Sequence, residues 1–352
     1  MNIFKRDLSG HKSYIDILRI IAIFMVYYVH TGTRAMHHYQ IEGGPISYYA
    51  ALFLNTLALA GPPIFFAISG GLLLSRDIDL KKLLTRRIPK YILIILIFNL
   101  LQLYYKAIAS PEMLQNPFLD LLKMIYGYTL IAQYWFLNAY LVFLCLLPVL
   151  AAAAKNMSRK AFEYLIGLFL VIEFALKILE YFMETERIEL NFGPWDSILI
   201  APFVGFYIEK YYEDLTSDRI KLLIINFAAL IAVICNVRYM DVLYKNELPS
   251  AYLGGTVILI VMAVYTDVKL LLDERINKKH TATIFKILGD GVFLAYLIEI
   301  QMKDLYIGFY DKTVNTISWL GATVLWLIPG ILTAILIRFV LSLIPGVRKI
   351  IP

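Results

Sequence analysis

The chain contains 352 residues, of which 60% are hydrophobic and 17% are charged, and its formal net charge at pH 7 is +6. Soluble globular proteins are about half apolar, so this composition excludes an ordinary soluble protein. The basic residues are distributed as in a membrane protein, and the positive charge is therefore not read as a sign of nucleic-acid binding.

Apolar segments long enough to cross a bilayer recur along the whole chain. The sequence therefore predicts an all-α, polytopic membrane protein of about ten transmembrane helices, with residues 1–352 forming a single domain. The two cysteines, Cys145 and Cys235, both lie in apolar segments, so neither a disulfide framework nor a metal site is expected. The predicted spans are 14–34, 48–74, 88–107, 131–152, 161–182, 196–212, 219–237, 250–271, 284–306 and 316–343.

Lysines and arginines are concentrated in alternate connecting segments, beginning with the amino terminus. Connections on the cytoplasmic side of a membrane carry such an excess of basic residues. The bias predicts that both termini are cytoplasmic and that the chain resides in the cell membrane. Among the outer connections, the piece 118–126 is amphipathic, and we expect it to lie along the membrane surface.

The first span contains an arginine and a histidine eleven residues apart. Arg19 and His30 return to nearly the same helix face, about 16 Å apart along the axis, together with Asp16 and Tyr27. Ionisable side chains inside a span usually face a protein interior or a wet cavity. His30 is suited to removing a proton from a hydroxyl group, or it is a histidine hydrogen-bonded between packed helices. Arg19 either pairs with Asp16 or binds a cytosolic anionic donor.

The second span contains the sequence Gly61-Pro62-Pro63, which we expect to break or bend the helix. Further along, Ser69-Gly70-Gly71 permits close approach of a neighbouring helix. A nucleophilic role for Ser69 is not favoured, because nothing in the sequence places a base beside it.

The basic segment 76–90 precedes the third span. Ordinary positive-inside topology accounts for it, but clustered basic residues such as Lys82, Arg86 and Arg87 also suit a ligand that carries phosphates. Pro89 fits the first turn of a helix, which places the two arginines at its amino-terminal edge, where the helix dipole favours anions.

Polar and aromatic side chains also mark later spans. Tyr134 and Trp135, at the outer start of the fourth span, belong either to the interfacial aromatic belt or to the wall of an acceptor pocket. In the fifth span, Glu173 and Lys177 have the spacing of a helical ion pair. Glu299, in the ninth span, has no partner of opposite charge assigned from the sequence, and it can face the same cavity as His30.

Five ordered segments of this chain resemble the type-3 membrane acyltransferases, which O-acylate cell-surface glycans and related molecules. Together these segments extend over nearly the whole chain. The sequence departs from the family at Glu299, where many members carry a histidine. The segments are Leu18-Arg19 through His30, Gly61-Pro62-Pro63-Ile64-Phe65-Phe66-Ala67-Ile68-Ser69-Gly70-Gly71, Lys82 through Pro89, Gln133-Tyr134-Trp135-Phe136-Leu137, and Leu288 through Glu299.

The resemblance implies an enzyme that moves an acyl group, which we expect to be acetyl, from cytosolic acyl-coenzyme A to a hydroxyl of an envelope glycan or a lipid-linked precursor. His30 is expected to be the base or a transient acyl carrier, and Arg19 to assist catalysis. Lys82, Arg86 and Arg87 are the expected donor-binding residues. A transporter or flippase, and a sensor or scaffold, remain the alternatives. The expected substrate-binding residues are Tyr27, Ser69, Tyr134, Trp135 and Glu299.

Overall fold

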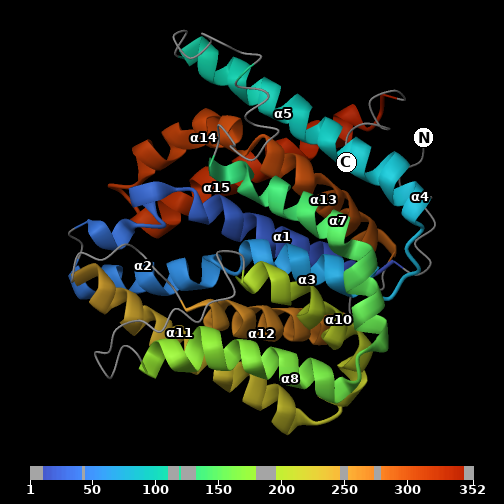
Figure 1. The fold of residues 1–352 in the computed structure, drawn as a ribbon. Helices are drawn as coiled ribbons and strands as arrows, with labels where there is room; N and C mark the ends of the chain where they lie inside the picture. The colour runs from blue at the N-terminus through green and yellow to red at the C-terminus, as the bar shows by residue number, and fades with distance from the viewer. Residues whose placement is uncertain are drawn as a thin grey trace. The chain divides into compact units, whose positions relative to one another are not determined.

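The computed structural model describes residues 11–41, 44–109, 119, 132–179, 196–245, 253–272 and 279–344. Throughout these residues the regular structure is helical, which confirms the predicted all-α class for this part of the chain (Figure 1). The predicted amphipathic piece 118–126, apart from Leu119, lies outside the described residues.

The chain divides into two compact units. Unit 1 comprises Met1–Leu72 and Asn156–Val340, and unit 2 comprises Leu73–Lys155 and Leu341–Pro352. Both Arg19 and His30 belong to unit 1, whereas the basic segment 76–90 and the pair Tyr134 and Trp135 belong to unit 2.

Several helices in the described part of the chain are long and apolar enough to cross a membrane, which indicates a multi-pass membrane protein. A further pair, Thr281–Leu297 and Glu299–Thr313, passes the same test only when its two helices are taken together. Ten spans and cytoplasmic termini stay predictions. The six single candidates are Gly44–Leu73, Leu80–Tyr105, Trp135–Asn156, Arg219–Val242, Gly254–Leu272 and Trp319–Leu341.

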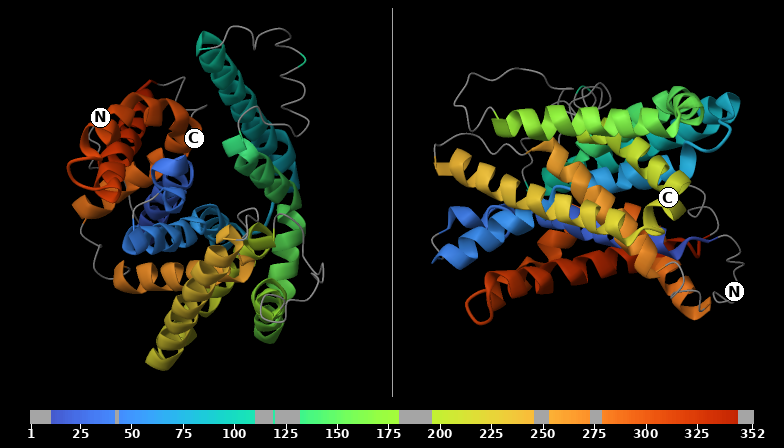
Figure 2. Two further views of the ribbon diagram at one scale, coloured as in Figure 1. Left: turned by 90° about the vertical axis from the view of Figure 1, so that its left-hand side faces the viewer. Right: turned by 90° about the horizontal axis from the view of Figure 1, so that it is seen from below.

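Unit 1 is built around helix α1, which packs against α2, α12 and α13, while α12 also packs against α10 and α11 (Figures 1 and 2). On α1, Leu18, Ala22 and Tyr27 are fully buried. Leu18 and Tyr27 lie on opposite faces of the helix, so α1 is covered on more than one side. The helices of unit 1 are α1 Ser13–Val29, α2 Gly44–Ala58, α3 Gly61–Leu73, α8 Arg159–Leu170, α10 Asp196–Thr216, α11 Arg219–Lys245, α12 Gly254–Leu272, α13 Lys279–Leu297, α14 Glu299–Thr313 and α15 Trp319–Leu341.

Two interruptions divide spans that hydropathy alone joins. Helix α2 ends at Ala58 and α3 begins at Gly61, so the predicted break at the Gly-Pro-Pro sequence is confirmed. The second interruption was not predicted: α13 and α14 meet at an angle of 94°. The expectation of one continuous helix through 284–306 is therefore wrong, because Ile298 leaves helical geometry without any proline or glycine.

Helices α3 and α10 cross with their backbones in contact. A Cβ atom added to Gly70 would lie 2.0 Å from the carbonyl oxygen of Pro202, and one added to Gly205 would lie 1.9 Å from that of Ala67. Only glycine leaves room for such an approach, and the close packing predicted at Ser69-Gly70-Gly71 is confirmed at Gly70.

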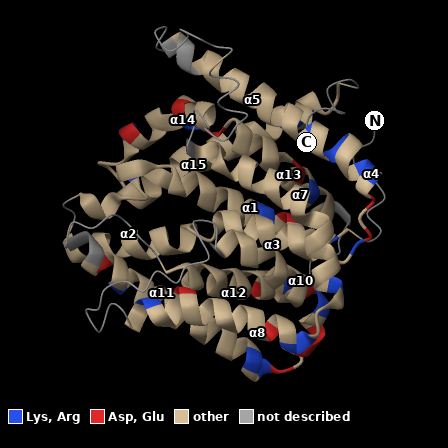
Figure 3. Cartoon of the chain, in the orientation of Figure 1, with Lys and Arg blue, Asp and Glu red and all other residues tan. Residues whose placement is uncertain are grey.

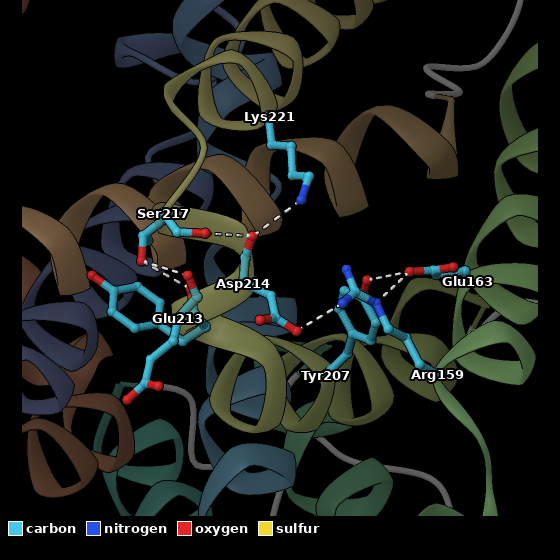
Figure 4. Close-up of polar contacts among 9 residues, drawn as sticks. Arg159, Glu163, Tyr207, Glu213, Asp214, Ser217 and Lys221 are labelled. Carbon is cyan, nitrogen blue, oxygen red and sulfur yellow. Dashed lines mark hydrogen bonds and ion pairs between the residues drawn. The ribbon is translucent and has the colours of Figure 1, made fainter.

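A charged cluster joins α8 to α10 at one end of unit 1 (Figure 4). Arg159 donates from Nε to Glu163 and from Nη1 to Asp214, both at 2.8 Å. Tyr207 donates its hydroxyl to the same Glu163 carboxylate at 2.9 Å, and Lys221 at the start of α11 reaches the Asp214 carbonyl. These contacts hold the ends of α8, α10 and α11 together.

Residues 31–41, which follow α1, pack against α15 through planar side chains. This segment contains the short 3₁₀ turns η2, Gly32–Arg34, and η3, His38–Gln40. The imidazole of His38 stacks on Trp319 with ring centroids 4.4 Å apart. Seven residues further along α15, Trp326 lies under the Arg34 guanidinium. Residues seven apart share one helix face, so both contacts lie along the same side of α15.

We expect the folded protein to lose stability as the pH falls below about 6.5, because burial lowers the pKa of both His37 and His38. A histidine with a lower pKa in the folded state binds more protons once unfolded, so protonation favours unfolding. Thermal unfolding at pH 7.5 and 5.5 tests this expectation. The double variant His37→Gln, His38→Gln should show a smaller drop than the parent protein; an equal drop would contradict the assignment.

Unit 2 contains α4 Leu80–Lys82, the π-helical turn η4 Leu83–Arg87, α5 Ile88–Ala109, the 3₁₀ turn η6 Ala132–Tyr134 and α7 Trp135–Asn156. The basic segment 76–90 also contains two aspartates, Asp77 and Asp79, and both contact lysines of unit 2. Lys155 donates to Asp77 at 2.5 Å, and this bond lowers the pKa of the Asp77 carboxyl. Asp79 accepts from the Lys82 backbone at 3.0 Å and thereby caps α4.

Candidate active site

His30 lies immediately after the carboxyl end of α1, and its ring faces a carboxylate from α14. Nδ1 of His30 lies 2.9 Å from both carboxylate oxygens of Glu299. A carboxylate can only accept hydrogen bonds, so in a neutral imidazole this geometry favours the tautomer with the proton on Nδ1 and the lone pair on Nε2. The Glu299 side chain is buried, whereas that of His30 is 17% exposed. The imidazole is therefore oriented on one side and accessible to a reactant.

Lys303 completes this arrangement one helical turn further along α14. Its Nζ donates to the His30 backbone carbonyl at 2.7 Å and forms an ion pair with Glu299 at 2.8 Å. The Lys303 carbonyl accepts in turn from the indole nitrogen of Trp326 on α15, also at 2.8 Å. A cation at the carboxyl end of α1 and a carboxylate at the amino end of α14 both suit the helix dipoles.

The bend between α13 and α14, at Ile298 and Glu299, brings the start of α14 beside His30. Glu299 is the first residue of α14, so the 94° turn brings its carboxylate to the end of α1. Tyr27 fixes the other side of the bend by donating its hydroxyl to the Ala295 carbonyl of α13 at 2.8 Å. That hydroxyl is buried and committed to the backbone, and the predicted part of Tyr27 in substrate binding stays a prediction.

Arg19 pairs with Asp16, as one of the two sequence interpretations expected. Its Nη1 donates to the buried Asp16 carboxylate at 3.1 Å, and His11 approaches the second carboxylate oxygen at 2.7 Å. The Arg19 side chain remains 32% exposed, so the pair does not enclose the guanidinium. Structural pairing and donor binding are thus compatible in one residue.

A second, largely covered carboxylate lies near the same end of α1. Glu209 of α10 accepts from the Tyr14 hydroxyl at 2.6 Å and from Lys12 at 2.5 Å. Lys269 and Tyr265 of α12 reach it at 3.4 and 3.1 Å. Charged residues are concentrated toward the ends of the helices, and the middles of most helices contain few of them (Figure 3).

The Gly289-Asp290-Gly291 sequence of α13 serves the packing of α1 and α15. A Cβ on Gly289 would lie 2.4 Å from the Asp16 carboxylate, so glycine makes room for that buried acid. Asp290 accepts from Lys286 at 3.1 Å, and Arg338 lies 3.9 Å from it. Basic side chains of α13 and α15, Lys286 and Arg338, thus both approach the carboxylate that follows Gly289.

The remaining predicted site residues have partners other than the His30–Glu299 pair. Ser69 donates to the Phe65 carbonyl at 2.9 Å, one turn back on its own helix. In unit 2, Tyr134 is buried and accepts from Gln102 at 3.0 Å. There too, Trp135 packs edge to face on Phe136, with ring centroids 6.2 Å apart. Their roles with substrate stay predictions.

The expected donor-binding residues of unit 2 are all exposed, and one of them, Lys82, forms an ion pair. Lys82 forms an ion pair with Asp79 at 3.1 Å, although its side chain is 69% exposed. Arg86 and Arg87 are exposed on the π-helical turn. Single π-helical turns of this kind occur frequently at functional sites. Donor binding by these three residues stays a prediction.

Comparison with known protein families matches residues 12–343 to the acyltransferase domain of the acyltransferase 3 family. The chain belongs to the acyltransferase 3 family. It is therefore an acyltransferase, and the family implies an acyl donor and an acyl acceptor as substrates. Neither the curated proteins nor the solved structures contain a match to it.

Two contacts of Glu299 in this acyltransferase, with His30 and with Lys303, were not predicted from the sequence. Glu299 was treated as unpaired, but it contacts both His30 and Lys303. The signal for Lys303 was present, since Glu299 and Lys303 have the i,i+4 spacing of a helical ion pair. The contact with His30 joins residues far apart in the chain, and no local spacing indicates it.

Proposed function

We propose that this protein transfers an acetyl group from cytosolic acetyl-coenzyme A to a hydroxyl of an envelope glycan or its lipid-linked precursor. The observation that carries the proposal is the contact between His30 Nδ1 and Glu299 at 2.9 Å. It holds the imidazole by one nitrogen and leaves Nε2 available as a general base. We place the enzyme in the cytoplasmic membrane as a single domain of about ten spans with both termini inside.

In the proposed step, Nε2 of His30 accepts the proton of the acceptor hydroxyl as its oxygen attacks the thioester carbonyl. A carbon–oxygen bond forms, the carbon–sulfur bond breaks, and coenzyme A leaves as a thiolate. The imidazolium then returns its proton to the sulfur, which restores the neutral histidine. Glu299 stabilises the imidazolium while it exists, and Lys303 balances the charge of Glu299. Transient acylation of His30 itself is the other route open to the same residue.

Arg19 supports binding of the donor at the other end of α1. Its side chain is 32% exposed, and a guanidinium suits the phosphates of coenzyme A. The helix rise separates Arg19 from His30 by about 16 Å. The extended pantetheine arm suits such a separation between phosphates and thioester. In unit 2, we propose that the exposed Arg86 and Arg87, with Lys82, bind phosphates of coenzyme A.

Mass spectrometry of envelope glycans tests the reaction. We expect glycans from cells that produce the protein to carry an added acetyl mass that is absent from cells without it. Purified protein should transfer label from acetyl-coenzyme A to the same glycan fraction. Substrate movement without any acetylation would instead favour a transporter and overturn the proposal.

The Glu299→Gln variant should lower kcat for acetyl transfer by about 10²- to 10⁴-fold. A neutral amide cannot stabilise the imidazolium, and it can hold the ring in the wrong tautomer. The KM for acetyl-coenzyme A should change little, because Glu299 contacts His30 at the carboxyl end of α1, whereas Arg19 lies nearer the amino end of that helix. Steady-state kinetics of the purified full chain measure both constants.

Glu163→Gln provides the matched control, since it makes the same chemical change in the α8–α10 cluster. Glu163 contacts Arg159 and Tyr207 and has no contact with the histidine. We expect its kcat to remain close to that of the parent protein. Equal losses in the two variants would show that the effect of Glu299 is not specific to His30.

A further inference from the structure

Arg34 presents a half-exposed guanidinium four residues beyond His30. Its Cζ atom lies 5.9 Å from the ring centroid of Tyr310 and 5.9 Å from that of Trp326. The two rings pack edge to face, with centroids 5.7 Å apart. Aromatic faces attract a guanidinium without using its N–H groups. The side chain is therefore fixed in position and 47% exposed.

Among the residues that the structure describes, the anionic partner of the guanidinium is a distant one. Asp311 of α14 lies 3.9 Å from its Nε, which is longer than a hydrogen bond, and the Asp311 side chain is itself 57% exposed. Within the described ranges no hydrogen bond from the Arg34 side chain is present. Its N–H donors thus face solvent, in the fork geometry that matches a carboxylate or phosphate.

A hydrogen bond ties the Tyr310 ring to Arg34, and a short path through Lys303 ties the Trp326 ring to His30. The Tyr310 hydroxyl donates to the Arg34 backbone carbonyl at 2.9 Å. The indole of Trp326 donates to Lys303, whose Nζ contacts His30. The rings that hold Arg34 therefore belong to the helices that position His30. An anion bound by Arg34 would have a defined place relative to the accessible imidazole nitrogen.

We propose that Arg34, Tyr310 and Trp326 form an acceptor subsite for an anionic group, a carboxylate or a phosphate, on the molecule that is acetylated. This inference rests on the proposed function and specifies its acceptor as an acidic one. The planar fork of Arg34 binds the anion, and the rings orient the fork. Asp311 competes weakly for the guanidinium and gives way to the anion.

Acetylation of matched acceptors tests the subsite. The probes are methyl glucuronide with methyl glucoside for a carboxylate, and glycerol 3-phosphate with glycerol for a phosphate. We expect the parent protein to prefer one acidic probe to its neutral partner, and Arg34→Gln to lower that preference about tenfold, mainly through KM for the acceptor. Arg34→Lys should fall between them, since it keeps the charge but not the fork.

Two further variants separate anion binding at the subsite from misfolding and from the general charge of the surface. Asp311→Asn should strengthen the preference for the acidic probe, a gain that misfolding cannot produce. Lys312→Gln removes one positive charge from an exposed position on the same turn of α14, and it should leave the preference unchanged. An equal loss in Lys312→Gln and Arg34→Gln would assign the effect to general electrostatics and overturn the subsite.

The outcomes distinguish this inference from the proposed function. Acetyl transfer without a preference for either acidic probe would overturn the subsite and leave the proposed reaction intact. An Arg34→Gln variant that loses acidic and neutral acceptors equally would assign Arg34 to folding alone. If the parent protein acetylates no hydroxyl acceptor, both the reaction and the subsite are overturned.

Discussion

His30→Ala is expected to lower kcat for acetyl transfer by about 10²- to 10⁴-fold, the range that a positioned general base contributes. The side chain is the accessible member of a pair whose other member, Glu299, is buried. Removing the imidazole leaves the acceptor hydroxyl without a base and leaves Glu299 paired only with Lys303 among the groups described around it. The measurement is label transfer from acetyl-coenzyme A to glycan by the purified full chain.

Imidazole added to the medium sharpens this experiment. The alanine variant has an opening beside Glu299, so free imidazole should restore part of the lost transfer if His30 acts as a base. His37→Ala is the matched control, because it removes another imidazole from the segment after α1 without touching Glu299. A folded His30→Ala protein with undiminished transfer would remove His30 from the mechanism.

Gly205→Leu is expected to prevent assembly of unit 1. A Cβ at this position would lie 1.9 Å from the Ala67 carbonyl oxygen, and backbone cannot move aside as a flexible side chain can. Overpacking a buried site usually costs 1–3 kcal/mol, and we expect a loss of about 3 kcal/mol or more here. Thermal unfolding and size-exclusion chromatography of detergent-solubilised protein measure the loss.

Gly167→Ala controls for the effect of replacing a glycine in a helix. Nothing lies within 4 Å of a Cβ at this position on α8. Alanine stabilises a helix by up to about 1 kcal/mol relative to glycine, so this variant should unfold at the same temperature or slightly higher. Normal stability of Gly205→Leu would mean that α3 and α10 do not cross as described.

The sequence predicted the helices far better than the way they are broken. The break before Gly61 was predictable because two prolines and a glycine disfavour a continuous helix there. The turn at Ile298 was not, since neighbouring residues are compatible with helix. The contacts of Glu299 and Lys303 with His30 accompany that turn, and they join segments about 270 residues apart.

Residues of the site were predictable where they share one helix. Arg19 and His30 stand out because charge is costly within an apolar segment, and Asp16 lies at the spacing of a partner. The relation between His30 and Glu299 depends on tertiary packing, so Glu299 was predicted as a substrate contact rather than as the partner of the imidazole. Arg34 gave no local signal, because its rings come from α14 and α15.

The right-angled turn between α13 and α14 also determines whether this pair of helices adds one membrane crossing or none. If the two helices together cross once, α15 begins on the opposite side of the bilayer from the start of α13. If they enter and return, α15 begins on the same side as the start of α13. The carboxyl terminus then lies on the opposite side of the membrane from its position in the first case. The direction in which the chain leaves the membrane thus depends on a single non-helical residue, Ile298.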